Sequence, residues 1–309
     1  MTTFTLGVNT CFAVKRWPEP ERWAEIVRER VGVDLVQHSM DLIRLDGSAG
    51  LRSRQAESIR LACERRGLLL HSTFTGLAAY SSNMLLDPVP EVRTLAEEWW
   101  RRAIAFTALV DARATGGHVG AFTVTDWRDD RRRMERWGNL RAGLDRLAVA
   151  AREAGLDALY VENLAAAREP STMAQIESLL TEGDRDRVPI ALCLDLGHQC
   201  VSGTSGEERD PYAWLERFGS RAPVVQLQQS DAAADHHWPF TPEKNALGRI
   251  DPDRVLTSLA ASGAENVALV LEIIPPFEED DDRVIDDMAV SAELWRDALQ
   301  RHRAAGSLS

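Results

Sequence analysis

The chain has 309 residues, of which 44% are hydrophobic and 27% are charged, a balance typical of a globular protein with a sizeable core. Its formal net charge of -12 argues against a nucleic-acid partner, because such binding depends on a basic surface that neutralises phosphates. No apolar run reaches the roughly twenty residues that span a bilayer, and the first residues lack the features of a signal peptide, so we expect no membrane partner and a cytoplasmic location.

Apolar runs typical of buried strands alternate with helical segments along the chain. The expected strands are residues 4–9, 32–38, 68–74, 112–120, 156–162, 189–195, 224–229 and 267–272. The expected helices are residues 18–30, 53–66, 90–110 and 130–154, one with a capping-box-like start at Ser171, then 210–219, one starting at 250, and 281–301. Eight strands alternating with eight helices, without a linker, predict a single-domain α/β protein, a (β/α)8 TIM barrel over residues 1–309. A doubly wound parallel sheet is the alternative.

Strands five, six and eight of this pattern each end in a carboxylate: Glu162, Asp195 and Glu272. In a parallel barrel the carboxyl ends of all strands lie on one face, so these side chains are expected to converge there. Like charges at close range repel one another and burial adds to the cost, so the group needs a cation. Hard oxygen ligands favour Mg²⁺ or Mn²⁺. The alternative is that the carboxylates pair with arginine.

Strand seven is expected to supply a fourth, uncharged ligand. Gln228 stands at its end, and Gln226 has the same parity and is the rival. His236 and His237 lie in the loop beyond and could reach the site, although a loop histidine is more often exposed. We predict Gln228.

Histidines stand near the ends of three expected strands, with His71 on strand three, His118 on strand four and His198 three residues after Asp195. One histidine in such a place can be satisfied structurally. Three at equivalent strand ends predict a polar pocket that binds a ligand rich in hydroxyl groups.

Four motifs occur in a fixed order: Glu162-Asn163, Leu194-Asp-Leu-Gly-His198, a polar strand-seven residue followed three positions later by Asp231, and Leu271-Glu-Ile-Ile-Pro-Pro276. In this order they resemble the xylose-isomerase-like superfamily of sugar isomerases and ketose 3-epimerases, and the resemblance covers essentially the whole chain. Residues 9–20, 71–80 and 235–241 are similar to the branch that acts on four-carbon ketose phosphates, the erythrulose-phosphate 3-epimerases.

The resemblance implies a metal-dependent carbohydrate epimerase, an isomerase in class, that is a homo-oligomer, either a dimer or a tetramer. It implies a divalent metal, Mn²⁺ or Mg²⁺, bound by Glu162, Asp195, Gln228 and Glu272. It further implies that Glu162 and Glu272 form the acid/base pair and that His198 holds a substrate hydroxyl or carbonyl. Two positions depart from the family pattern: the usual strand-seven histidine is Gln228, and Arg168 stands where sugar epimerases tend to carry a glutamate.

Arg168 can bind a phosphate through two parallel hydrogen bonds, and Lys244 and Arg249 lie in the loop after strand seven, where barrels often place phosphate. Each of these residues could instead be solvated surface. We therefore expect a small-molecule ketose or ketose phosphate as the substrate, and epimerisation at C3 of a tetrulose phosphate such as erythrulose 1-phosphate.

Other functions fit parts of the pattern. An aldose–ketose isomerase or a free-ketose 3-epimerase would use the same site, and a lyase subunit that cleaves oxidised sugar conjugates is a further alternative. An endonuclease of abasic DNA would want a basic groove, which the net charge opposes. A non-catalytic sugar-binding protein would not need opposed glutamates.

Overall fold

The computed structural model describes residues 2–306. Eight parallel strands form a closed barrel in the order in which they occur in the sequence, which confirms the predicted (β/α)8 fold. The strands are β1 (Thr3–Asn9), β2 (Leu35–Ser39), β3 (Leu69–Phe74), β4 (Ala114–Gly117), β5 (Ala158–Glu162), β6 (Ile190–Asp195), β7 (Val224–Leu227) and β8 (Asn266–Leu271).

Helices occupy every connection between consecutive strands, and one more helix follows the last strand. They are α1 (Pro20–Glu25) with the π-helical η2 (Ile26–Val31), α2 (Ala49–Arg66), α3 (Pro90–Leu109), α4 (Val124–Arg128), α5 (Asp130–Glu153), α6 (Met173–Leu179), α7 (Pro211–Phe218), α8 (Pro242–Asn245), α9 (Pro252–Ala261) and α10 (Asp281–Gly306). Among the described residues, none of these helices combines the length and apolarity needed to cross a bilayer.

Several boundaries differ from the sequence-based prediction, and three of these differences have a clear local reason. Strand β2 begins at Leu35 and not at residue 32, because Gly32 ends the preceding helix with a φ of 72°. Strand β4 ends at Gly117, whose φ is 124°, so His118 lies beyond the strand. The capping box of α6 uses Thr172 with Gln175, one residue later than the predicted start at Ser171.

The chain divides into two compact units. The first unit consists of the residues up to Gln37, Ala62–Leu69 and the described residues from Cys193 onward. The second unit consists of His38–Leu61 and Leu70–Leu192. The single-domain organisation expected from the sequence remains a prediction.

In the first unit, the strand registers align several polar residues at the carboxyl ends of the strands. Strand β1 pairs with β8 from Thr3↔Asn266 to Val8↔Leu271, and β7 pairs with β8 up to Leu227↔Leu271. Glu272 and Gln228 are the next residues after this last pair. Asp195 pairs with Gln226 in the β6–β7 register. The registers therefore place these polar side chains at the carboxyl ends of neighbouring strands.

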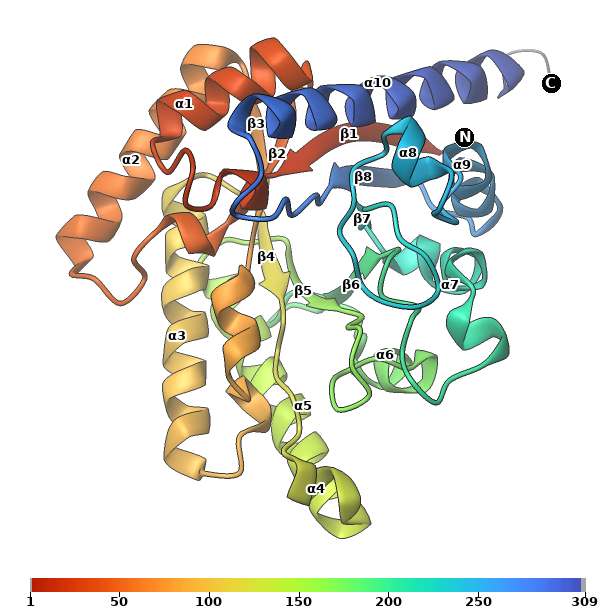
Figure 1. Ribbon diagram of the computed structural model, residues 1–309. Coiled ribbons are helices and arrows are strands. Elements are labelled where there is room, and N and C mark those ends of the chain that lie inside the picture. Colours follow the sequence, from red (N-terminus) through yellow and green to blue (C-terminus); the bar gives the residue numbers. More distant parts are fainter. Residues whose placement is uncertain (1, 307–309) are drawn as a thin grey trace. The chain divides into compact units, whose positions relative to one another are not determined.

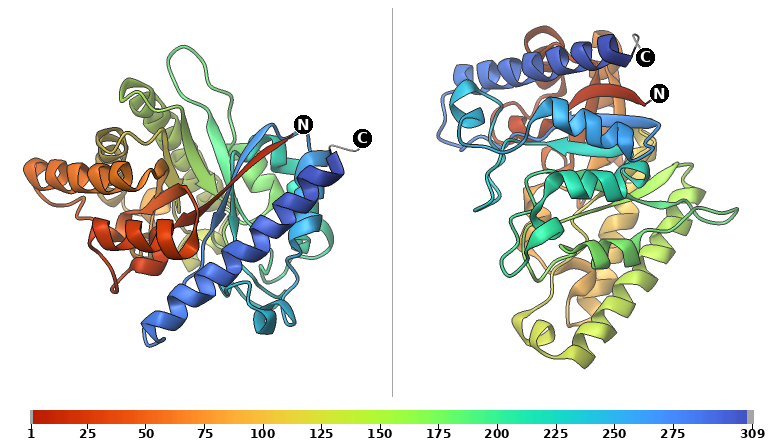
Figure 2. Two further views of the ribbon diagram at one scale, coloured as in Figure 1. Left: turned by 90° about the horizontal axis from the view of Figure 1, so that it is seen from above. Right: turned by 90° about the vertical axis from the view of Figure 1, so that its right-hand side faces the viewer.

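Helix α10 covers β1 in this unit and packs against α9 (Figures 1 and 2). Its residues Met288, Ala292 and Trp295 are fully buried and lie at helical spacing on one face. Trp295 meets Phe240 edge to face, with ring centroids 5.4 Å apart. This packing anchors the start of α8, which follows the loop after β7.

The core of the second unit lies between β3, β4, β5 and the paired helices α3 and α5, which run side by side in Figure 1. Trp100 on α3 and Leu140 and Leu144 on α5 are buried in it. The hydroxyl of Thr73 on β3 bonds to those of Thr107 and Thr115 at 2.6 and 2.8 Å, so the buried polar groups are paired.

Candidate functional site

Asp195 closes β6 and is fully buried in the first unit. Its Oδ1 accepts hydrogen bonds from the Gly197 backbone N–H at 2.6 Å and from the Gln228 Nε2 at 3.0 Å. Hydrogen bonds of this kind stabilise the charged form of a buried carboxylate. The apolar strand thus delivers a carboxylate that is held by hydrogen bonds to its own end.

Gln228 is fully buried directly after β7, and its amide group lies between two carboxylates. Its Nε2 donates to Asp195 and, at 2.9 Å, to Asp235 Oδ1, while its Oε1 accepts from the backbone N–H of His237 at 2.6 Å. A Cβ on Gly197 would come within 2.2 Å of the Gln228 Cδ, so only glycine at 197 leaves room for this amide.

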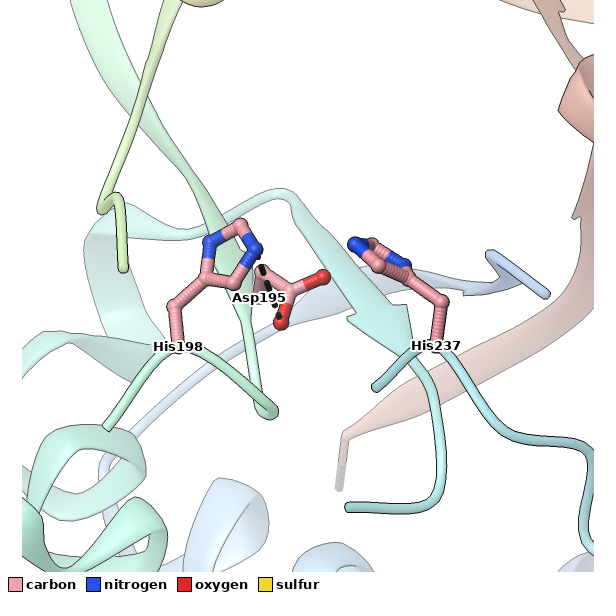
Figure 3. Close-up of side chains that lie close together, drawn as sticks. All are labelled: Asp195, His198 and His237. Atoms are coloured by element: carbon pink, nitrogen blue, oxygen red, sulfur yellow. Dashed lines mark ion pairs between the residues drawn. The ribbon is translucent and has the colours of Figure 1, made fainter. Parts of the chain in front are cut away.

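Asp235 links two imidazoles. Its Oδ2 lies 3.2 Å from His198 Nε2 and 3.2 Å from His237 Nε2. Figure 3 shows His198 and His237 on either side of the Asp195 carboxylate. Among residues 2–306, Asp195, His198 and His237 offer ligand atoms that all lie within 4.8 Å of one another, a spacing that suits a metal ion.

The charges of this cluster shift its pKa values in opposite directions. Burial acts to lower the pKa of His237, but the carboxylates of Asp235, Glu272 and Asp195 together outweigh it and raise that pKa to about 9. Burial acts to raise the pKa of Asp235, but His198 and His237 outweigh it and hold that pKa well below its usual range. The cluster therefore favours a cation in contact with these carboxylates.

Glu272 follows β8 and is buried with its carboxylate held by two amides. Its Oε1 accepts from Asn9 Nδ2 at 2.9 Å and from Gln226 Nε2 at 2.8 Å. Both amides also donate to Gln37 Oε1 at 3.0 Å, which fixes their orientation. His237 Nδ1 lies 3.1 Å from the backbone oxygen of Glu272. Gln226, the rival strand-seven ligand, thus supports Glu272.

The second unit holds Glu162 at the end of β5, fully buried. The Tyr80 hydroxyl donates to Glu162 Oε2 at 2.7 Å, and the Tyr80 ring stacks on His118 with centroids 4.6 Å apart. Burial lowers the pKa of His118 to about 4, with the backbone oxygen of Ser82 opposing the shift. Burial also lowers the pKa of His71, whose Nδ1 lies 3.1 Å from the Ser72 hydroxyl.

The three basic residues expected to bind phosphate have partners of their own. Arg168 is exposed, and its Nη1 donates to the Phe122 backbone oxygen at 2.7 Å. The Nζ of Lys244 lies 3.4 Å from Glu243 Oε1 and 4.9 Å from the ring centroid of Trp238. Arg249 donates to the backbone oxygens of Arg209 at 2.6 Å and Gln199 at 3.1 Å. Their role in binding phosphate stays a prediction.

The first unit brings together Asp195, His198, Gln228 and Glu272 from the predicted set. Glu162 lies in the other unit, and its membership in the same metal site stays a prediction. Sequence reasoning missed Asp235, which lies in the loop after β7, and Tyr80, which lies in the 3-10 helix Leu77–Ser81 after β3; neither stands at a strand end. Both residues occur in segments that resemble the epimerase branch, and that was their available signal.

Comparison with known proteins places the chain among sugar-processing barrels. The D-erythrulose 1-phosphate 3-epimerase of Brucella abortus (strain 2308) is 28% identical over 300 residues, which are 94% of this chain and 95% of that protein. The crystal structure of a candidate xylose isomerase from Rhodospirillum rubrum ATCC 11170 has 34% identity and a TM-score of 0.87, covering 95% of this chain and 99% of that one.

D-psicose 3-epimerase from Clostridium cellulolyticum H10, solved with D-tagatose, shares the fold at 16% identity and a TM-score of 0.69, covering 96% of this chain and 99% of that one. The Brucella abortus and Rhodospirillum rubrum relatives agree with the class of enzyme that the motifs predict, a carbohydrate isomerase or epimerase. A family model described as a xylose isomerase-like TIM barrel matches residues 27–298. The chain therefore belongs to the xylose isomerase-like TIM barrel family.

Proposed function

We propose that the protein is a metal-dependent 3-epimerase of a short ketose phosphate, such as the tetrulose erythrulose 1-phosphate. The observation that carries this proposal is the pair of buried carboxylates Asp195 and Glu272, each held by hydrogen-bond donors at the end of a barrel strand. The similarity to the Brucella abortus D-erythrulose 1-phosphate 3-epimerase over 94% of the chain supports the choice of substrate.

The donor set of the first unit fits a divalent ion. Asp195 and Glu272 supply hard oxygen atoms, and the carboxyl end of a parallel barrel is where Glu162 of β5 would join them. We assign the fourth ligand to the segment that follows β7, which contains the predicted Gln228. When bound there, Mn²⁺ or Mg²⁺ supplies Lewis-acid polarisation of the substrate carbonyl.

Epimerisation removes a proton from the carbon beside a carbonyl and returns one to the opposite face, so it needs one base on each face. We assign these roles to Glu162 and Glu272. Asn9 and Gln226 hold the Oε1 of Glu272, and Tyr80 holds the Oε2 of Glu162, so each carboxylate is oriented by its own neighbours. General acid/base catalysis of this kind is typically worth about 10²–10⁴-fold.

The remaining polar side chains would bind the substrate. His198, His118 and His71 are the proposed partners of its hydroxyl and carbonyl oxygens. Arg168 is the first candidate for the phosphate, because its guanidinium is exposed and carries four further N–H donors beyond the one bonded to Phe122. Lys244 and Arg249 are further candidates, although the Arg249 guanidinium already serves two carbonyl groups.

The test is proton exchange in deuterated water, followed by NMR, across free and phosphorylated ketoses of three to six carbons. We expect deuterium at C3 of a tetrulose phosphate together with formation of its C3 epimer. Exchange at C1 or C2 with formation of an aldose would instead identify an aldose–ketose isomerase, a result that the similarity to the candidate xylose isomerase of Rhodospirillum rubrum would favour. Exchange with none of these sugars would contradict both activities.

A further inference from the structure

Both the oxygen and the nitrogen of the Gln228 amide form hydrogen bonds with other groups of the protein. Its Oε1 accepts from the His237 N–H at 2.6 Å, and its Nε2 faces carboxylate oxygens of Asp195 and Asp235 at 3.0 and 2.9 Å. Exchanging the two amide atoms would set an oxygen against carboxylates and an NH₂ against an N–H, so the hydrogen-bond network fixes their assignment. The close contact with Gly197 prevents the amide from shifting. The group facing the acids is therefore a donor, which cannot ligate a metal.

The backbone of His237 is held in a conformation that non-glycine residues rarely adopt, with a φ of 47°. Besides the bond to Gln228, its carbonyl accepts from the Ile274 N–H at 3.2 Å. The next residue, Trp238, pairs with Gln229 through two backbone bonds of 2.8 and 3.1 Å. Three attachments thus maintain a disfavoured backbone conformation, an arrangement that is concentrated at binding sites.

The His237 ring is oriented like that of a metal ligand. Its Nδ1 lies 3.1 Å from the backbone oxygen of Glu272, so in the neutral form that a metal ligand requires, the proton would sit on Nδ1 and the lone pair on Nε2. This Nε2 faces Asp235 Oδ2 at 3.2 Å, and His237 forms a close group with Asp195 and His198 (Figure 3). Metal-binding histidines almost always donate their second ring N–H to such an acceptor.

The neighbouring histidine lacks this arrangement. The His236 ring stacks on Trp238 with centroids 3.8 Å apart and an interplanar angle of 9°, and its Nε2 lies 3.1 Å from Asp231 Oδ1. It is therefore a matched control for a substitution at His237.

We infer that His237 supplies the ligand from the β7 side of the metal centre and that Gln228 is a positioning residue that holds it there. This inference rests on the metal centre of the proposed function and revises its fourth ligand. The imidazole that the family pattern places at the end of strand seven would thus come from nine residues later in the chain, with Gln228 in the original position.

The experiment measures Mn²⁺ binding by the full chain in the absence of substrate. The affinity comes from titration followed by electron paramagnetic resonance, and the coordinated imidazole is detected as ¹⁴N modulation of the spin echo. We expect this modulation in the wild type. His237→Gln should lose it and bind Mn²⁺ at least about 100-fold more weakly, whereas His236→Gln should keep both properties. Gln228→Ala should keep the modulation and lose about 10–100-fold in affinity, as the loss of a group that orients a ligand does.

Persistence of the ¹⁴N modulation in a folded His237→Gln protein would overturn the assignment, since another nitrogen would then be the ligand. Its absence from the Mn²⁺-loaded wild type would also overturn it, and this result does not depend on any variant folding. Because neither measurement uses a substrate, failure to epimerise any ketose phosphate would contradict the proposed reaction and leave the ligand assignment in place.

Discussion

His237 and His118 are both largely shielded from water, but their surroundings shift their pKa values in opposite directions. His237 of the first unit lies beside Asp235, which raises its pKa to about 9 against the effect of burial. His118 of the second unit stacks on Tyr80, and burial lowers its pKa to about 4. The carboxylate-rich cluster of the first unit is suited to a cation, whereas His118 provides a neutral ring that can bind uncharged hydroxyl groups. Under the proposed function, this difference would separate charge compensation from substrate recognition.

The largest expected effect comes from removing a base in either region. Glu162→Gln and Glu272→Gln should each lower kcat for epimerisation by at least about 10²–10⁴-fold, because each removes the base for one face of the substrate. Solvent deuterium should still exchange into one epimer when only the opposite face has lost its base. Steady-state kinetics with circular dichroism as a control for folding would check this. Unchanged turnover in either variant would show that the pair is misassigned.

The neutrality of His118 predicts a pH dependence of stability. Its pKa is lowered from 6.5 to about 4. Between pH 4 and pH 6.5, His118 is therefore protonated in the unfolded chain and neutral in the folded protein. The contribution to stability is therefore complete above pH 6.5 and is lost as the pH falls toward 4. At about 1.4 kcal/mol per pKa unit the loss amounts to about 3 kcal/mol.

Urea unfolding at neutral pH and near pH 4 would measure this contribution. The fall in the free energy of unfolding should be about 3 kcal/mol smaller in His118→Asn than in the wild type. An equal fall in both proteins would mean that His118 titrates normally in the folded state.

Tyr80→Phe removes one hydroxyl and keeps the ring that stacks on His118. Hydrogen bonds to charged groups are worth about 1.5–3 kcal/mol, so kcat should fall by about 10-fold or more if Tyr80 orients Glu162 for proton transfer. The free energy of unfolding should change little, since Tyr80 is 39% exposed. If this variant keeps the kcat of the wild type, the Tyr80 hydroxyl does not contribute to proton transfer and the side chain has only a packing role.

The smallest expected effect concerns the phosphate. Arg168→Ala should raise KM for a tetrulose phosphate by about 10-fold and leave the kinetics of the free tetrulose unchanged. The reason is that the phosphate is the only group of the substrate that the guanidinium would contact. Comparing kcat/KM for the two substrates in both proteins provides the test. If free hexuloses are the better substrates and Arg168→Ala has no effect, the phosphate assignment is wrong.

The sequence predicted the fold well, since continuous apolar runs such as that of β6 specify buried strands whatever the tertiary context. Boundaries were missed where a glycine leaves the helical or extended region, as at Gly32 and Gly117. Asp195 and Glu272 could be proposed as site residues because a strand fixes the position of the residue at its end. The positions and orientations of side chains on loops could not be predicted from the sequence. The inward orientation of His237 depends on a positive φ and on bonds to residues distant in sequence, such as Ile274.

In the proposed reaction, proton transfer depends on a divalent ion held by the carboxylates at the strand ends. The direct measurement is the rate of C3 epimerisation after chelation and after reconstitution, with the metal content determined on the same samples. We expect the chelated protein to be inactive and activity to return with Mn²⁺ or Mg²⁺ in proportion to bound metal, and Asp195→Asn to prevent this recovery. Full activity in protein shown to contain no metal would contradict the account.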